Sequence, residues 1–337
     1  MTKMPTKVLV YEYISGGGCA DADVMRELLP AGRAMRNAIA GDLARVAGVS
    51  VTCAMTASEA GDAARRAPDT RQLAYCQPPA GSDPCHFVGK EALHHDAVWV
   101  IAPETDGVLA RFCDAVETSR WIGCDAESIR IASSKRRTAR RLAQAGIATT
   151  RAWSVDAPLQ PGPGAWVVKP DDGAGAVDTL FYHDFRTAEY AFLHRAAAHE
   201  RVTFEEWVEG DAMSLSLLCN HGSAELLSIN WQHVSVVGGR VRYDGVTVGS
   251  IALNSLVGYS CRELARRIAA ALPGLAGFVG IDVVWHRERG PVVIEINPRA
   301  TCAYADLAKR GELDLAARIL ANHRAEQADD ERTRHAA

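Results

Sequence analysis

Two acids and an amide in the C-terminal third of the chain form a pattern suited to a metal ion. The apolar segments 280–285 and 292–299 flank a short turn of charged residues and glycine, which predicts a β-hairpin. If that turn is centred between positions 288 and 289, Asp282 lies opposite Glu295, and Asn297 shares their face. Two carboxylates and an amide oxygen suit Mg²⁺ rather than a soft metal. The alternative is an amphipathic hairpin whose acids only face solvent.

Two lysines add positive charge that could hold phosphate groups. Lys135 opens a basic helix that is predicted from Ser133 to Gly146, and Lys169 ends the apolar strand 166–169. An unpaired charge in an apolar strand is costly, so Lys169 is expected to have a ligand as its partner. Lys135 taken alone is better interpreted as a solvated helix lysine among arginines. Together, two ammonium groups can bind phosphates as flexible point charges.

A glycine-rich loop follows the second lysine directly. Residues 171–176 read Asp-Asp-Gly-Ala-Gly-Ala, and backbone N–H groups beside glycine can approach phosphate oxygens closely. A plain turn would use the same residues. The chain contains neither G-x-x-x-x-G-K-[ST] nor G-x-G-x-x-G, so P-loop and Rossmann nucleotide sites lack their motif.

The elements that must position these residues form several domains. A length of 337 residues predicts two or three domains. Strands expected at 7–10, 49–54 and 97–102 alternate with helical stretches, one of them from about Ala31 to Ala47, as in a parallel α/β domain. We expect this domain over 1–128, two α+β subdomains over 129–204 and 205–322, and a frayed, solvated tail over 323–337.

Composition narrows the class of protein. The formal net charge is −4 and the positive charges are scattered, which disfavours a nucleic-acid binder. Nine dispersed cysteines without a C-x-x-C pair argue against both a disulfide framework and a zinc module. The N-terminal apolar run is too short for a signal peptide, and no stretch approaches the length of a membrane span. A cytoplasmic protein without a membrane anchor is therefore expected.

The segment Glu295-Ile296-Asn297-Pro298-Arg299 resembles the metal-binding strand of ATP-grasp ligases. The two lysines and the glycine loop occur in that family's order, and the resemblance spans roughly residues 132–299. It implies an ATP-grasp fold, in which an N-terminal parallel α/β domain precedes two α+β subdomains that clasp ATP. Ser134 departs from the family's pattern, as does the segment near Ala212, where many relatives carry an acid that holds the ribose.

The resemblance also implies a role for each motif residue. Two Mg²⁺ ions, with Mn²⁺ as a substitute, would be held by Asp282, Glu295 and Asn297. Arg299 and Lys169 would be catalytic. The ATP site would comprise Lys135, Lys169, the glycine-loop residues Asp172, Gly173, Ala174 and Gly175, and the hinge strand Glu205, Glu206, Trp207 and Val208, of which Glu205 and Val208 are the adenine candidates.

Such enzymes convert a carboxylate to an acyl phosphate, which an amine then attacks. Segments 8–18, 101–107 and 230–233 are similar in particular to tyramine–glutamate ligases of methanofuran- or methylofuran-type cofactor biosynthesis, which implies L-glutamate and tyramine, or a related aromatic amine, as substrates. The substrate candidates are Glu12, Gly17, Glu104, Asn230, Gln232 and Tyr243. Ordinary strand-end turns would explain the first three equally well.

Other functions remain open at this stage. They are another amino-acid or dipeptide ligase, a kinase that phosphorylates a hydroxyl, and a non-catalytic ATP-binding regulatory protein. The expected partners are small molecules, an amino acid and an amine, with no nucleic acid or membrane and with a homodimer as one possibility. His94, His95 and His233 lack a metal-ligand spacing and are interpreted as surface or loop histidines, and Cys302 as a small packing residue.

Overall fold

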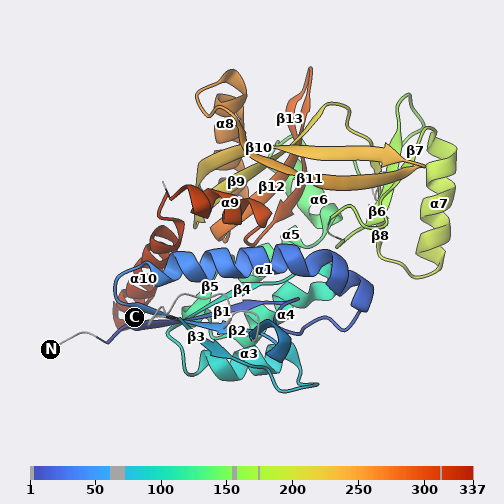
Figure 1. The fold of residues 1–337 in the computed structure, drawn as a ribbon. Coiled ribbons are helices and arrows are strands. Elements are labelled where there is room, and N and C mark those ends of the chain that lie inside the picture. The colour runs from blue at the N-terminus through green and yellow to red at the C-terminus, as the bar shows by residue number, and fades with distance from the viewer. Residues whose placement is uncertain (1–3, 61–72, 154–157, 174, 312, 337) are drawn as a thin grey trace.

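A computed structural model describes residues 4–60, 73–153, 158–173, 175–311 and 313–336. Its strands form two separate β-sheets (Figure 1). The N-terminal residues, blue to cyan in Figure 1, form the first sheet and its helices, and the second sheet lies above them.

The first sheet is parallel and has the strand order β3-β2-β1-β4-β5. Its central strand β1 (Thr6–Glu12) is buried from Val8 onward, as expected for a strand covered on both faces. The other strands are β2 (Val49–Ala54), β3 (Leu73–Cys76), β4 (Ala97–Ile101) and β5 (Trp121–Ile122). The helical segments between them are α1 (Ala22–Ala44), α3 (Pro84–Ala92), η1 (Thr105–Gly107), α4 (Val108–Ala115) and η2 (Thr118–Arg120), and α5 (Ala126–Ala132) and α6 (Lys135–Gln144) follow β5.

Helix α1 begins nine residues before the expected start at Ala31. The side chain of Asp21 accepts hydrogen bonds from the backbone N–H groups of Asp23 and Val24, so it caps the helix there. Pro30 lies inside the helix rather than at its start. The cap and the buried apolar face therefore outweigh the helix-breaking tendency of a single proline.

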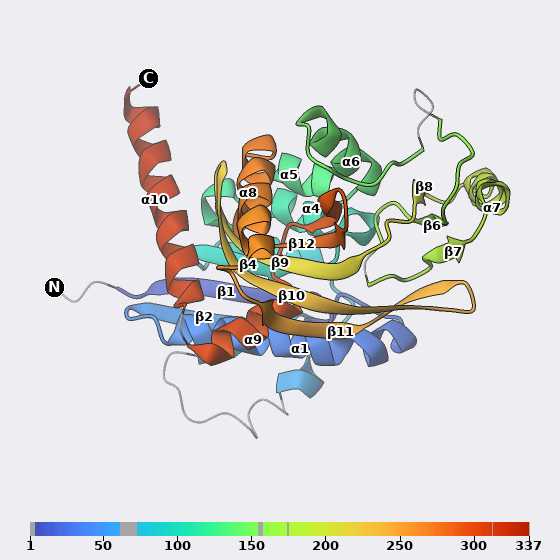
Figure 2. The same cartoon turned by 90° about the horizontal axis from the view of Figure 1, so that it is seen from above.

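The second sheet has eight strands in the order β13-β12-β9-β10-β11-β7-β6-β8. A single register pair between Arg240 and Leu180 joins its larger part to the small group β7-β6-β8 (Figure 2). Its strands are β6 (Trp166–Pro170), β7 (Leu180–Tyr182), β8 (Val202–Glu206), β9 (Asp211–Asn220), β10 (Ser223–Val237), β11 (Arg240–Ile251), β12 (Ala276–His286) and β13 (Gly290–Asn297). Its helices are α7 (Phe185–Ala197) beside the small group and α8 (Leu256–Ala271) beside the larger part.

The last helices return to the first sheet. Helix α9 (Cys302–Arg310) packs on α1, and α10 (Leu315–Ala336) contacts α1, β5 and β12. Tyr304 of α9 is fully buried, and its ring packs edge-on against Trp99 of β4 and Phe278 of β12. One hydrophobic core thus combines the beginning and the end of the chain.

The expectation of a frayed tail from residue 323 is wrong. Helix α10 continues to Ala336, and the side chain of His323 is buried. Gln327, one turn later, lies within hydrogen-bond distance of the His323 ring and donates to the carbonyl of Ser119. Within the described ranges, no helix is both long and apolar enough to cross a membrane.

Candidate active site

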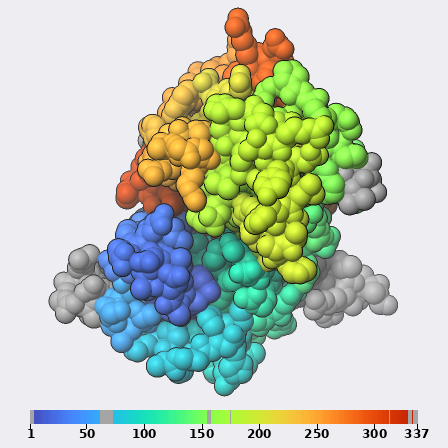
Figure 3. All heavy atoms as spheres, turned by 90° about the vertical axis from the view of Figure 1, so that its right-hand side faces the viewer, coloured from blue at the N-terminus to red at the C-terminus, as the bar shows by residue number. Residues whose placement is uncertain are grey.

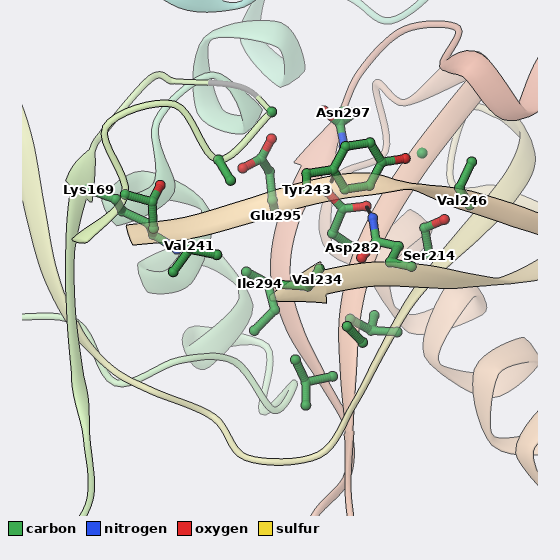
Figure 4. Close-up of a pocket in the computed structure, with 18 of the residues that line it drawn as sticks. Lys169, Ser214, Val234, Val241, Tyr243, Val246, Asp282, Ile294, Glu295 and Asn297 are labelled. Atoms are coloured by element: carbon green, nitrogen blue, oxygen red, sulfur yellow. Dashed lines mark hydrogen bonds between the residues drawn. The ribbon is translucent and has the colours of Figure 1, made fainter. Parts of the chain in front are cut away.

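A cavity of about 650 Å³ lies between the small strand group β7-β6-β8 and the larger part of the second sheet. Figure 4 shows Asp282, Glu295, Asn297 and Tyr243 close together and Lys169 at the far side. Figure 3 views the molecule from the side of this small group, whose yellow-green residues lie above the blue and cyan N-terminal part. Residues of the small strand group and of the larger part of the second sheet therefore line the same cavity.

The predicted pairing of the two acids is confirmed. Asp282 is the register partner of Glu295, and Gly280 is the partner of Asn297. The turn is centred one half-residue earlier than expected, because Val283 pairs with Val293. A β-bulge at Ile294, which has no register partner, restores the pairing of the acids. Ile294 and Glu295 both line the cavity as a result.

The carboxylate of Asp282 is held by two amides. Gln232 Nε2 donates to its Oδ1 at 2.9 Å, and Asn297 Nδ2 donates to its Oδ2 at 3.4 Å. The surrounding protein and then the charge of Glu295 raise the pKa of Asp282 to about 7. A cation between the two carboxylates would relieve this repulsion. Among the described residues no group of three or more His, Cys, Asp or Glu side chains is placed to hold a metal, and the third polar group beside the two acids is the amide of Asn297.

Lys135 stands at the N-terminus of α6, which Ser134 caps. Its Nζ lies 3.1 Å from Oε2 of Glu295 and donates to the carbonyl of Gly173 at 2.5 Å. Burial disfavours the charged form, but Glu295, Glu205 and Glu104 together more than offset this effect, so the pKa of Lys135 is raised. The ammonium group thus connects the acid face, formed by Asp282, Glu295 and Asn297, to the glycine loop.

Lys169 forms an ion pair with Glu205 of the neighbouring strand β8, with Nζ 2.8 Å from Oε2. Both side chains are buried, so Lys169 has a partner within the chain, whereas a ligand was expected in that role. The second oxygen of Glu205, Oε1, is buried without a hydrogen-bond partner. An acceptor without a donor inside a cavity favours a ligand that donates there.

The rest of the hinge strand also faces the cavity. Trp207 packs its ring edge-on against Phe181, with the ring centroids 5.2 Å apart, and Val208 is buried. Glu206 is fixed by two arginines, since Arg151 Nε lies 2.6 Å from Oε2 and Arg289 Nη1 lies 2.8 Å from Oε1. Burial alone would raise the pKa of Glu206, but hydrogen bonds from Arg289 and Arg151 lower it.

The glycine loop is tied to α6 by an acid that the sequence did not single out. Asp171 accepts hydrogen bonds from Ser134 Oγ at 2.7 Å and from the backbone N–H of Arg136 at 2.9 Å. Gly173 and Gly175 line the cavity, whereas Asp172 does not. Ala174 lies outside the described residues.

Arg299 follows the metal-binding strand and lines the cavity. Its Nη2 donates to Oε2 of Glu104 at 2.9 Å, and its Nε lies 2.9 Å from Oε1 without the alignment of a hydrogen bond. Burial acts against the charge, but Glu104 and then Glu295 raise the pKa of Arg299. Glu104 is therefore occupied by an internal partner.

The substrate candidates separate into two groups. Gln232 and Tyr243 line the cavity, whereas Glu12, Gly17, Glu104 and Asn230 do not. Glu12 accepts hydrogen bonds from the N–H groups of Ile14 and Ser15, and Gly17 occupies a turn with φ +84°. Asn230 is fully buried and binds two serine hydroxyls and the N–H of Gly249. These contacts build the fold rather than the cavity.

The expectations for the histidines hold, and the one for the cysteine is corrected. His95 lies in the loop between α3 and β4, where it is buried and contacts the carbonyl of Glu91 at 2.7 Å. His233 is exposed on β10 and lines the cavity. Cys302 is exposed at the start of α9 and also lines the cavity, rather than packing in the core.

Several wall residues were missed by the sequence analysis. They are apolar residues brought to the cavity by different strands: Val167, Trp231, Val234, Val241, Val246 and Ile294. Alternation along β10 and β11 could have indicated which side chains share a face. The irregular register of these strands, with shifts near Gln232, hid that alternation.

Family profiles match most of this chain. Residues 132–303, just over half of the sequence, match the profile described as an ATP-grasp domain. The chain belongs to the ATP-grasp family. Residues 56–129 match a second profile, described as a pre ATP-grasp 3 domain. No curated protein sequence gives a significant match.

Solved structures share the ATP-grasp fold at low sequence identity. An ATP-grasp superfamily protein from Archaeoglobus fulgidus is 20% identical with a TM-score of 0.65, covering 91% of this chain and 89% of its own. An L-amino acid ligase from Bacillus licheniformis is 18% identical with a TM-score of 0.61, at 88% and 68% coverage. A D-alanine–D-alanine ligase from Bacillus anthracis, solved in complex with ATP, is 13% identical with a TM-score of 0.62, at 96% and 99% coverage.

Proposed function

We propose that this ATP-grasp protein is an ADP-forming ligase that joins a carboxylate to an amine through an acyl phosphate. The observation that carries the proposal is one cavity that combines Asp282, Glu295 and Asn297 with the lysines Lys135 and Lys169. Oxygen ligands suit Mg²⁺, and lysines suit phosphates. Phosphoryl transfer needs both kinds of group in one place.

One observation that does not depend on the family supports ATP as the ligand of this cavity. The buried, unpartnered Oε1 of Glu205 can accept a hydrogen bond from the exocyclic amine of adenine. Val208 and Ile294 offer apolar surface for the ring. Gly173 and Gly175, beside Lys135 and Lys169, would then lie near the phosphates.

The acid face fits divalent metal. Asp282, Glu295 and Asn297 would hold two Mg²⁺ ions, with Mn²⁺ able to substitute, and the bound metal would neutralise charge on the phosphates. Lys135 already meets Glu295 at 3.1 Å and would share that carboxylate with the metal. Burial and then repulsion from Glu295 raise the pKa of Asp282, and a cation beside the two carboxylates would favour their charged forms.

The chain's own residues would carry the rest of the reaction. Lys169 and Arg299 would stabilise the charge that develops on the transferring phosphoryl group and the acyl phosphate. The glycine loop, anchored to α6 through Asp171, would exclude water that otherwise hydrolyses this intermediate. The amine then attacks the acyl carbon, an amide forms, and inorganic phosphate leaves.

L-glutamate is proposed as the acid and tyramine, or a related aromatic amine, as the nucleophile. The resemblance of three sequence segments to tyramine–glutamate ligases supports this choice. The cavity wall next to the acid face supports an aromatic acceptor, because Trp231, Tyr243 and Val234 line it. A ligase for other amino acids would use the same catalytic residues, so the substrates must be measured.

The deciding experiment is Mg²⁺-dependent release of ADP from ATP with L-glutamate, adding one amine or amino acid at a time, with mass detection of products. ADP with a glutamyl amide confined to tyramine-like amines would support the full proposal. ADP with another amide would retain the ligase and replace the substrates, whereas a phosphorylated product without an amide would indicate a kinase. ATP binding without ADP across the panel would contradict the ligase and favour a regulatory protein.

A further inference from the structure

The loop that follows β4, residues 103–107, contacts both sides of the candidate active site. Glu104 of this loop pairs with Arg299 beyond the metal-binding strand. The next two residues contact Asp172 in the glycine loop: Thr105 Oγ1 donates to its carbonyl at 3.2 Å, and the N–H of Asp106 donates to its Oδ2 at 3.0 Å. One short loop after a strand of the first sheet therefore contacts both the segment that carries Arg299 and the glycine loop.

The contact with Arg299 fixes the orientation of its guanidinium group. Two of its nitrogens meet Glu104 at 2.9 Å each, and Nη1 donates to the carbonyl of Ala300 at 3.3 Å. Both ionic side chains are largely buried, with exposed fractions of 15% for Arg299 and 6% for Glu104. Little water competes for these contacts, so they are stronger than a surface ion pair.

The contact with the glycine loop is reinforced by a third element. Arg201, just before β8, has its Nη2 2.6 Å from Asp172 and 3.0 Å from Asp106. Asp172 therefore points to this network and not into the cavity. This arrangement explains why the acid expected to bind ATP does not line the site.

The loop keeps an uncommon backbone to make these contacts. Asp106 has φ 54° and ψ 21°, in the left-handed region, and Gly107 follows with φ 67°. Non-glycine residues rarely adopt this conformation. The carbonyl of Asp106 accepts a hydrogen bond from Arg111 at 2.6 Å, which stabilises the turn.

We infer that Glu104 is a positioning residue, which holds Arg299 at the angle needed to meet the terminal phosphate, within a loop that also fixes the root of the glycine loop. The inference rests on the proposed function, because Arg299 acts there on the transferring phosphoryl group. It replaces the expectation that Glu104 binds a substrate. Glu104 does not line the cavity, and both of its oxygens face Arg299.

The test is a double-mutant cycle on the full chain with E104Q, R299A and the double variant. Steady-state ADP release and calorimetric affinities for Mg–ATP and Mg–ADP are measured on each protein. E104Q is expected to lower kcat by roughly 10–100-fold and ATP affinity by roughly tenfold, with ADP affinity and the KM of the amine unchanged. E104D should recover part of the loss, because it restores the charge at a shorter reach.

The double variant shows whether Glu104 acts through Arg299 or independently of it. If Glu104 acts through Arg299, E104Q adds no further loss to R299A. Multiplied losses, a raised KM for the amine alone, or wild-type values for E104Q would overturn the inference. D114N is the control, since it removes one charge from the exposed pair between Asp114 and Arg130 in the same part of the chain. Absence of ADP release by the wild-type protein would refute the ligase, and the ATP-against-ADP affinities would still decide the role of Glu104.

Discussion

Each lysine of the cavity has a carboxylate partner within the chain. Lys135 meets Glu295, and Lys169 meets Glu205. Phosphate binding would therefore replace or share existing ion pairs rather than neutralise isolated charges. The pairs keep the ammonium groups buried and oriented, which reduces the reorganisation needed when a nucleotide binds.

Replacing Lys169 by methionine should weaken both ATP binding and the fold. Without its ammonium group, Glu205 remains as an uncompensated buried charge, which costs about 3–5 kcal/mol of unfolding free energy. ATP affinity should fall roughly tenfold or more, because a charge-assisted contact to phosphate is lost. Chemical denaturation and calorimetry would measure the two effects.

The double variant K169M/E205Q distinguishes these effects. Removing both charges should restore most of the unfolding free energy while ATP affinity stays low. Recovery of ATP affinity together with stability would show that Lys169 acts only as a structural partner of Glu205.

Replacing Glu295 by alanine should lower kcat at least about 100-fold. The variant should still fold, because relief of the repulsion from Asp282 offsets part of the loss of the Lys135 ion pair. Its side chain faces the cavity, so little core packing is lost. ADP release and a thermal melt are the measurements. Glu288→Ala, in the turn of the same hairpin, is the matched control and should keep wild-type activity. Wild-type turnover by Glu295→Ala would exclude Glu295 as a metal ligand.

At the scale of elements, the alternation of apolar and polar residues in strands and the capping residues of helices predicted much of the site. The opposition of Asp282 and Glu295 followed from the hairpin, and the Ser134 cap placed Lys135 at the start of α6. The bulge at Ile294 was not predictable from the sequence. The turn is centred one half-residue earlier than expected, and the extra residue of the bulge brings Asp282 and Glu295 back into register. Helix α10 was missed because its charged residues suggested a solvated tail, whereas its first turns are buried.

The buried ring of His323 should make the docking of α10 sensitive to acid. Burial and then the charge of Arg324 lower the pKa of His323 to about 4. The unfolded chain therefore binds a proton that the folded chain does not, and the unfolding free energy should fall as the pH drops from about 6.5 to 4, by at most about 1.4 kcal/mol per pH unit.

Denaturation curves across this range for the wild type and His323→Gln would measure the effect. The substitution should flatten the slope, whereas His94→Gln, on an exposed turn, should leave it unchanged. An unchanged slope in His323→Gln would assign the acid sensitivity to another group.

At the scale of the whole molecule, contacts between distant parts of the chain escaped the sequence. Glu104 and Arg299 are 195 positions apart, and nothing local to either indicates the other. Asp42 of α1 likewise accepts hydrogen bonds from the Tyr304 hydroxyl at 2.7 Å and from the N–H of Ala316 at 3.1 Å. Strand patterns predict which faces are buried, but they do not predict which element covers them.

Replacing Tyr304 by phenylalanine should lower the unfolding free energy by about 1–3 kcal/mol, because Asp42 loses one donor while the ring packing remains. Chemical denaturation would measure the loss, and ATP affinity should not change, since Tyr304 does not line the cavity. Tyr259→Phe, exposed on α8, is the control and should change stability by less than about 0.5 kcal/mol. An equal loss of unfolding free energy in both variants would show that the hydrogen bond between Tyr304 and Asp42 does not stabilise the fold.

The return of α9 and α10 to α1 also governs how the chain is made. The core that covers Val8, Val10 and Ile39 includes Leu315 and Ile319, which are translated long after them. During translation the first sheet therefore emerges before the helix that completes its core. Its apolar surface should stay partly uncovered until α10 has also been made.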